Sequence, residues 1–253
     1  MDSGLRTPLL DSFRRGEAPR DAKILAAQGA LAPRAHEQLR LLALLSIDDD
    51  PDIARTAEVT LKAMPPECIA AFLARTDAPP ELRAFFAARG IQPATTPAPD
   101  GDAPLFEVGE VPVAPADEPA QSTLQRLASM NVAERMAVAM KGTREERAVL
   151  IRDANKLVCC AVLSSPKLTE TEVEGFAKMG SMSEEVLRII AQTRAWMKRY
   201  GVVLALVKNP KTPVALSMNM LGRLNDKDVR GLVTDRNVPD VLRLAARKRG
   251  KPD

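Results

Sequence analysis

The sequence predicts an all-α protein in which a disordered, acidic, proline-rich linker joins two helical-repeat modules. Aromatic residues make up only 3% of the 253 residues, with one Trp and one Tyr. Because β-sheets favour aromatic and β-branched side chains, this composition argues against an all-β fold. Helix-start signals recur along the chain, and apolar residues follow them at a helical period. Related passages also occur in both halves, which is typical of repeat architectures.

Residues 91–122 form the expected linker. Seven of these 32 residues are Pro, none is Lys or Arg, and the net charge is −6. Such a segment cannot bury enough apolar area to offset its ordering entropy. We therefore expect a small N-terminal module at 1–90, whose first 20 residues are a candidate flexible extension, and a C-terminal module at 123–253. The apolar island 105–113 is either a sticky stretch of linker or a short peptide that docks on this chain or a partner.

Short helices with marked starts account for the rest of the chain. Asp50-Pro51 and Thr212-Pro213 place an N-cap before a Pro, and we expect Thr212 to accept from the first free N–H groups of its helix. Further starts with an acid three residues ahead are Asn131/Glu134, Thr143/Glu146, Thr169/Glu172, Asn225/Asp228 and Asn237/Asp240. The helical apolar spacing that follows predicts these inward faces: Val173, Phe176 and Ala177; Val186, Leu187 and Ile190; Leu216, Met220 and Leu224; Val241, Leu244 and Ala245. We expect about a dozen helices of 8–14 residues.

Internal repetition points to stacked helix pairs. Residues 72–83 match residues 232–243 without gaps: an apolar pair, a polar turn, a Pro, an acid and then Leu-Arg. Ser165-Pro166-Lys167 recurs 44 residues later as Asn209-Pro210-Lys211, and Ile151, Ile190 and Val233 are spaced by 39 and 43. A period near 40 with two short helices per unit is typical of an α-solenoid.

Two of these turns resemble a known family. Residues 205–216, Ala-Leu-Val-Lys-Asn-Pro-Lys-Thr-Pro-Val-Ala-Leu, resemble the helix–Asn-Pro-x-Thr-Pro–helix turn of HEAT-like and leucine-rich-repeat-variant proteins. Residues 45–54 resemble the same kind of turn in a HEAT-like unit, and residues 123–253 resemble a set of bacterial proteins without known activity. The chain has no N-terminal cysteine cluster of the kind that holds an iron–sulfur cluster in the variant repeats. The resemblance implies a HEAT-like solenoid and no particular activity.

Few residues are available for catalysis, and we predict no catalytic residue, no cofactor and no metal site. His36 is the single histidine, and we expect Cys68, Cys159 and Cys160 to be reduced, buried thiols. The acids at 48–52 lack the alternation and the Gly of a calcium loop, so we interpret them as helix caps. No phosphate-binding glycine loop or nucleophile elbow is present. The longest apolar run, 41–47, is too short to cross a membrane, and no secretory signal is visible, so we expect a cytoplasmic protein.

Charge gives the most informative functional signal. Residues 1–90 carry a net charge of −1, whereas residues 123–253 carry +10. If the helices stack regularly, the basic residues line one surface, which predicts a non-enzymatic adaptor that binds an acidic or extended segment of another protein. The alternatives are a solvated face, a nucleic-acid-binding repeat protein that uses the same residues, or a HEAT-like DNA glycosylase that uses Trp196 and Asp235. The predicted partner-binding residues are Arg194, Trp196, Lys198, Arg199, Lys208, Lys211, Arg243 and Arg247.

Overall fold

The computed structural model of the chain describes residues 7–31, 34–98, 105 and 120–249. These residues form sixteen α-helices and one short 3-10 helix, and none of them lies in a strand. The all-α class is therefore confirmed for this part of the chain, with more helices than the dozen expected. Within the same residues no helix is both long and apolar enough to cross a membrane.

The chain divides into two compact units whose boundary differs from the predicted one. The N-terminal unit consists of residues 1–150 and 157–167, and the C-terminal unit consists of residues 151–156 and 168–253. We expected the division at 91–122, but helices from both sides of that segment belong to the N-terminal unit.

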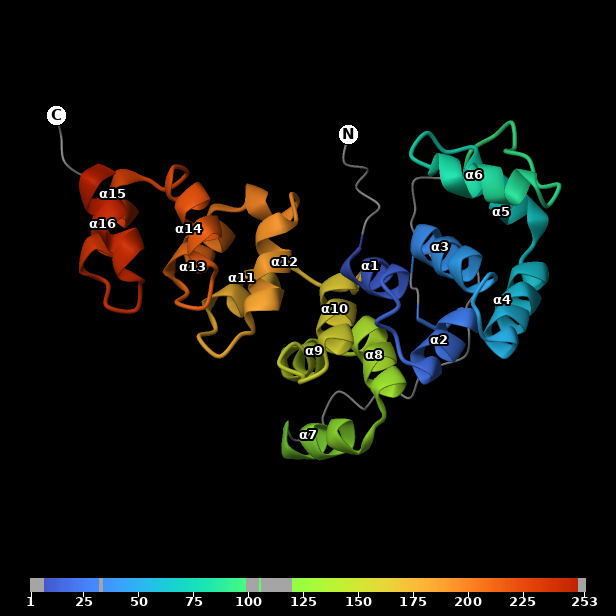
Figure 1. Ribbon diagram of the computed structural model, residues 1–253, viewed down its shortest axis with the longest axis horizontal. Helices are drawn as coiled ribbons and strands as arrows, with labels where there is room; N and C mark the ends of the chain where they lie inside the picture. Colours follow the sequence, from blue (N-terminus) through green and yellow to red (C-terminus); the bar gives the residue numbers. More distant parts are fainter. Residues whose placement is uncertain (1–6, 32–33, 99–104, 106–119, 250–253) are drawn as a thin grey trace. The chain divides into compact units, whose positions relative to one another are not determined.

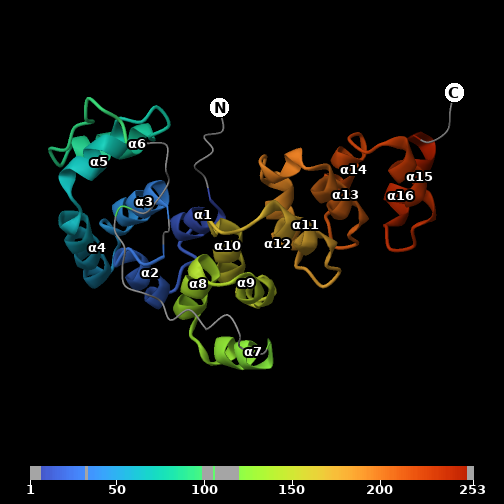
Figure 2. The same cartoon turned by 180° about the vertical axis from the view of Figure 1, so that it is seen from behind.

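Ten described helices make up the N-terminal unit: α1 (Pro8–Arg14), α2 (Arg20–Ala27), α3 (Ala35–Leu45), α4 (Pro51–Ala63), α5 (Pro66–Leu73), α6 (Pro80–Ala87), α7 (Ala120–Ser129), α8 (Val132–Lys141), α9 (Arg144–Leu150) and α10 (Lys156–Ser164). The central helix α3 packs on α1, α2, α4 and α6, and α2 also packs on α8. Figures 1 and 2 show α8 and α10 beside α1 and α2. The Leu9 N–H of α1 donates to Ser164 Oγ of α10 at 3.4 Å, in a buried contact. These contacts explain why the unit continues past the expected linker.

The first part of the expected linker lies along α5. The Ala94 N–H donates to Ala70 O at 2.9 Å, and the Ala98 N–H donates to Ala71 O at 2.8 Å. Residues 91–98 are thus held on the N-terminal unit, in contrast to the disorder that their composition predicts. Two backbone hydrogen bonds to a helix give this stretch partners that a composition argument does not consider.

Leu105 is the one residue of the apolar island 105–113 that the structure describes. Its N–H donates to Oε1 of Gln38, a fully buried residue of α3, at 2.9 Å. The rest of the island lies outside the described residues, and its docking stays a prediction.

The C-terminal unit contains η1, the 3-10 helix, and six described α-helices: α11 (Glu170–Lys178), α12 (Glu184–Gln192), η1 (Trp196–Lys198), α13 (Tyr200–Lys208), α14 (Val214–Leu221), α15 (Asp226–Thr234) and α16 (Asp240–Arg249). Helix α11 packs on α12, α13 on α14, and α15 on α16, so that successive helices form hairpins. The hairpins follow one another from orange to red in Figure 1, and α11 contacts α13 while α14 contacts α16. Apolar side chains such as Val173, Leu187, Leu206 and Leu232 are fully buried between them.

Five helix starts are confirmed because a local side chain caps them. Each cap accepts the backbone N–H two or three residues ahead, as its sequence spacing predicts. These caps are Asp50 before α4, Asn131 before α8, Thr143 before α9, Thr169 before α11 and Asn225 before α15.

Two other predicted starts are wrong. Helix α14 begins at Val214, and the buried Thr212 hydroxyl makes no hydrogen bond with any described residue. Helix α16 begins at Asp240, so Asn237 lies in the preceding turn, where its N–H donates to Asp235 Oδ1 at 3.0 Å. In both places the turn before the helix buries one of its own residues, Thr212 or Val238.

This turn recurs between helices. It begins one or two residues after an α-helix ends, the carbonyl of its first residue accepts the N–H three residues ahead, and the next residue precedes the following helix directly. Among the described residues, such turns are Arg75–Ala78, Met179–Met182, Asn209–Thr212 and Asp235–Val238. The last residue of each copy is buried, so Thr212 occupies a core position and not a capping one. The sequence match of 72–83 with 232–243 is confirmed as a structural match, since α6 and α16 begin at equivalent residues.

The inward face of α16 differs from the predicted one. Leu242 and Ala246 are buried, whereas Val241 and Leu244 are 59% and 57% exposed. Both sets have a spacing that places them on one helix face, so periodicity alone does not choose between them.

The burial of the thiols is partly as predicted. Cys159 and Cys160 are buried on α10, but Cys68 is exposed on α5, and none of the three forms a disulfide with a described residue. Helix α5 turns Ile69 and Phe72 into the core, and this rotation leaves Cys68 on the outside.

Candidate binding groove

A groove of about 640 Å³ lies along the C-terminal unit. Its size falls within the roughly 300–1,000 Å³ that is usual for ligand sites. Helices α11 and α13 line it, together with the turns that follow α11, α13 and α15. The lining includes Glu174, Lys178, Leu204, Lys208, Asp235 and Asn237.

Asn209 fixes the geometry of one end of the groove. Its Nδ2 donates to Ala177 O at 2.8 Å and to Met179 O at 2.9 Å, both at the C-terminal end of α11. Its Oδ1 accepts the Lys211 N–H at 3.0 Å, which shapes the turn after α13. The last carbonyls of a helix have no partner within the helix, so this buried amide supplies one and ties α13 to α11.

A close approach of α11 to α13 forms the middle of the groove. The Glu174 carboxylate lies directly over Gly201, where any Cβ would overlap it. Lys178, one turn further along α11, donates to Glu174 Oε1 at 2.6 Å. The small residue on α13 therefore gives room for an ion pair on α11 that faces the groove.

The remaining lining groups set the chemistry of the groove. Leu204 and Ala205 supply an apolar floor on α13, with Leu204 half-buried. Lys208 is exposed and forms no ion pair with a described residue. Asp235 accepts the Asn237 N–H, and the Asn237 side chain is exposed. The groove thus offers apolar contact along its floor and both donors and acceptors along its sides.

Most of the predicted partner-binding residues lie outside this groove. Arg194, Trp196, Lys198 and Arg199 precede α13, whereas Lys208 ends it. Nine residues at a rise of 1.5 Å separate Arg199 from Lys208 by about 13 Å along the helix axis. Among the eight predicted residues, only Lys208 lines the groove.

The residues at the start of α13 make contacts within the unit. Arg199 Nε donates to Glu170 Oε2 of α11 at 2.7 Å. The Tyr200 hydroxyl donates to the Asp228 carboxylate of α15. Partial burial, and secondly this hydrogen bond, raise the pKa of Tyr200 above its usual value. Arg199 and Tyr200 therefore link the start of α13 to α11 and to α15.

The other predicted residues are spread over two helices. Lys211 is exposed in the turn before α14. Arg243 is half-buried on α16 and pairs with Asp240 of the same helix, and Arg247 is exposed on α16. Trp196 is half-buried in η1 and Asp235 lines the groove, so the glycosylase pairing of these two residues gains no support from the lining.

The acids at 48–52 form ion pairs between α2 and the start of α4. Arg20 Nε donates to Asp50 Oδ2 at 2.7 Å and Lys23 Nζ to Asp48 Oδ2 at 2.8 Å. The Arg20 guanidinium lowers the pKa of Asp50, which also caps α4. His36 is buried on α3. No three His, Cys, Asp or Glu side chains are grouped to hold a metal ion in the part of the chain that the structure describes.

Sequence reasoning missed the residues that the groove brings together. Glu174 and Lys178 carry no signal in the sequence, and Asn237 is marked only as a helix start, because only the stacking of α11, α13 and α15 places these residues near Lys208. Asn209 was visible as a turn residue, but its bonds to α11 are tertiary. Comparison of the chain with family models, with curated proteins and with solved structures gives no match. The geometry of the groove is therefore what a functional proposal has to rest on.

Proposed function

We propose that the chain is a non-enzymatic, cytoplasmic adaptor with a HEAT-like solenoid architecture, which binds an extended segment of another protein in the groove of the C-terminal unit. One observation carries the proposal: α11, α13 and the turns that follow α11, α13 and α15 line a single open groove. Helix α13 has nine residues and is about 13 Å long. An extended strand advances about 3.3 Å per residue, so about four residues of a partner match the length of α13.

The lining indicates the chemistry of that segment. The exposed Lys208 favours an acidic side chain nearby, and the floor at Leu204 favours an apolar one. Glu174 and Asp235 would repel a segment made of acids alone. The proposed ligand is therefore an extended segment with mixed side chains and at least one acid, and Lys208 replaces the broad basic surface as its main contact.

A pull-down with the full chain tests this proposal, using native lysate with and without nuclease. The key variant is Lys208→Glu, and the matched control is Lys248→Glu. Both lysines are exposed in the last turn of a helix, and neither forms an ion pair with a described residue, so charge reversal has the same effect on the helix dipole.

We expect one partner protein to be retained after nuclease by the wild type and by Lys248→Glu. Its yield with Lys208→Glu should fall about tenfold, because attraction becomes repulsion at the groove. Equal losses in the two variants would contradict a role for the groove. Proteins that disappear after nuclease, together with co-purified nucleic acid, would favour the nucleic-acid alternative instead.

A further inference from the structure

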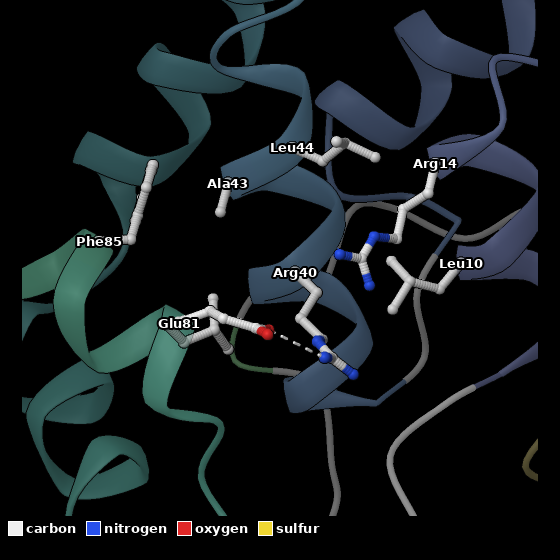
Figure 3. Close-up of a pocket in the computed structure, with 8 residues that line it drawn as sticks. Leu10, Arg14, Arg40, Ala43, Leu44, Glu81 and Phe85 are labelled. Carbon is white, nitrogen blue, oxygen red and sulfur yellow. Dashed lines mark hydrogen bonds and ion pairs between the residues drawn. The ribbon is translucent and has the colours of Figure 1, made fainter. Parts of the chain in front are cut away.

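A second cavity lies in the N-terminal unit, between α1, α3 and α6 (Figure 3). Its volume is about 190 Å³. The walls are apolar: Leu10 and Leu82 are buried, and Ala43, Leu44 and Phe85 are half-buried. An apolar cavity of about 150 Å³ holds a benzene molecule, whereas sites for whole small-molecule ligands usually begin near 300 Å³. The cavity therefore has room for one large apolar side chain.

Two arginines lie beside this apolar space. Figure 3 shows the Arg14 side chain between α1 and α3, near Leu10, and the Arg40 side chain on α3, joined by a dashed line to Glu81. Arg14 is exposed and forms no ion pair with a described residue. The Arg40 side chain is only 11% exposed and lies 3.4 Å from the carboxylate of Glu81, which is 71% exposed. Because Arg40 is nearly buried and already engaged, Arg14 supplies the positive charge that the rim offers to a ligand.

We propose that this cavity binds a short acidic peptide of a partner protein. An apolar side chain of the peptide enters the cavity, and a neighbouring Asp or Glu carboxylate pairs with Arg14. Guanidinium groups bind carboxylates through paired hydrogen bonds, which fixes the direction of the peptide over the cavity. This surface is separate from the groove of the C-terminal unit, so it does not depend on the function proposed above.

Binding of one defined peptide to the full chain tests the proposal. The probe is the fluorescein-labelled hexapeptide Gly-Glu-Phe-Glu-Gly-Ser, followed by fluorescence anisotropy. One control peptide replaces Phe by Ala, and another replaces both Glu by Gln. We expect saturable binding of the probe with a dissociation constant below about 1 mM, and about tenfold weaker binding of each control peptide.

Two variants of the protein separate the cavity from the rim. Ala43→Leu fills the cavity, and its control is Ala84→Leu, at an exposed position of α6 that does not line it. Arg14→Glu reverses a rim charge, and its control is Lys62→Glu, since both cations lie in the last turn of a helix. We expect each cavity or rim variant to weaken binding about tenfold and each control to stay within about twofold.

Three outcomes would overturn the proposal. The first is no saturable binding by the wild type and by a variant in which residues 106–113 are replaced by Gly and Ser. The second is binding that Ala43→Leu and Arg14→Glu leave unchanged. The third is binding by the replaced variant alone, which would show that the chain's own apolar island 105–113 occupies the cavity and excludes a partner.

Discussion

Replacing Asn209 is the sharpest test of how the C-terminal unit is held together. Asn209 is 4% exposed and makes three hydrogen bonds, two to α11 and one within its own turn. Each hydrogen bond contributes about 1 kcal/mol, and a buried carbonyl left without its donor adds to the loss. We therefore expect Asn209→Ala to lower the free energy of unfolding of the C-terminal unit by about 3 kcal/mol.

The Asn209→Asp variant separates hydrogen bonding from shape. It keeps the side-chain volume and the acceptor for Lys211, but it places a carboxylate oxygen against the carbonyls of Ala177 and Met179. This repulsion raises the pKa of the new carboxyl in the folded state. A raised folded pKa means that the stability is fully present below the unfolded pKa and is lost as the pH rises through the folded pKa. Asn209→Asp should thus lose at least as much stability as Asn209→Ala at neutral pH and recover part of it in mild acid.

Urea unfolding followed by tryptophan fluorescence measures both effects. Trp196 is the only Trp of the chain and lies in the C-terminal unit, so its signal reports on that unit. Asn219→Ala, at an exposed position of α14, is the control and should change stability by less than about 0.5 kcal/mol. A loss below about 1 kcal/mol for Asn209→Ala, or the same stability of Asn209→Asp at both pH values, would refute the reasoning.

Three further predictions follow from single side chains. Thr212→Val removes a buried hydroxyl that has no described partner and keeps the shape, so the same fluorescence assay should show a gain of about 1 kcal/mol. Tyr200 is the only Tyr, and its ultraviolet titration should have a midpoint above about pH 10, which Asp228→Asn should lower. The stabilisation by the neutral phenol is complete below about pH 10 and is lost as the pH rises through the folded pKa of Tyr200. Asp50→Asn keeps an N-cap but loses the charge that pairs with Arg20. At pH values above about 4, the thermal midpoint of this variant should therefore be lower than that of the wild type. The difference should disappear as the pH falls through the lowered folded pKa of Asp50.

The helix starts were predicted from residues that lie close together in the sequence. Contacts between distant segments did not enter that prediction. Asn131 and Thr169 cap their helices because the donor lies three residues ahead in the same chain segment. Thr212 has the same local pattern, but its turn buries the side chain. On α16, Val241 and Leu242 both continue into helically spaced apolar sets, and only the packing against α14 and α15 selects Leu242. Sequence periodicity therefore identifies a helix more reliably than it identifies its inward face.

The candidate site was predicted less well for the same reason. Lys208 was chosen for its charge, and its neighbours in the groove come from segments about 30 residues away on either side. Nothing in the sequence marks Glu174, and Asn237 is marked only as a helix start, so neither is predicted to lie in the groove. Arg14 and Arg40 lie in a region with nearly balanced charge, so a search for basic segments passes over the cavity that they border.

Short helices explain part of the basic character of the chain. A helix of eight or nine residues still has four C-terminal carbonyls without an internal partner, so a large share of its carbonyls need an outside donor. The repeated Ser-Pro-Lys and Asn-Pro-Lys turns supply such donors in the same way: Ser165 Oγ donates to Met140 O at the end of α8, as Asn209 does to Ala177 O at the end of α11.

Arginines serve the same purpose elsewhere. Arg249 donates to Leu221 O at the end of α14 and to Leu224 O in the turn after it, and Arg147 donates to Gly142 O at the end of α8. A cation that caps a neighbouring helix has its donors directed at carbonyls and away from a partner. The net charge of +10 over residues 123–253 therefore overstates the positive charge that is free to bind an acidic ligand. Lys208 and Arg14 differ from these arginines because no described group engages their donors, and this difference makes them the better places to look for binding.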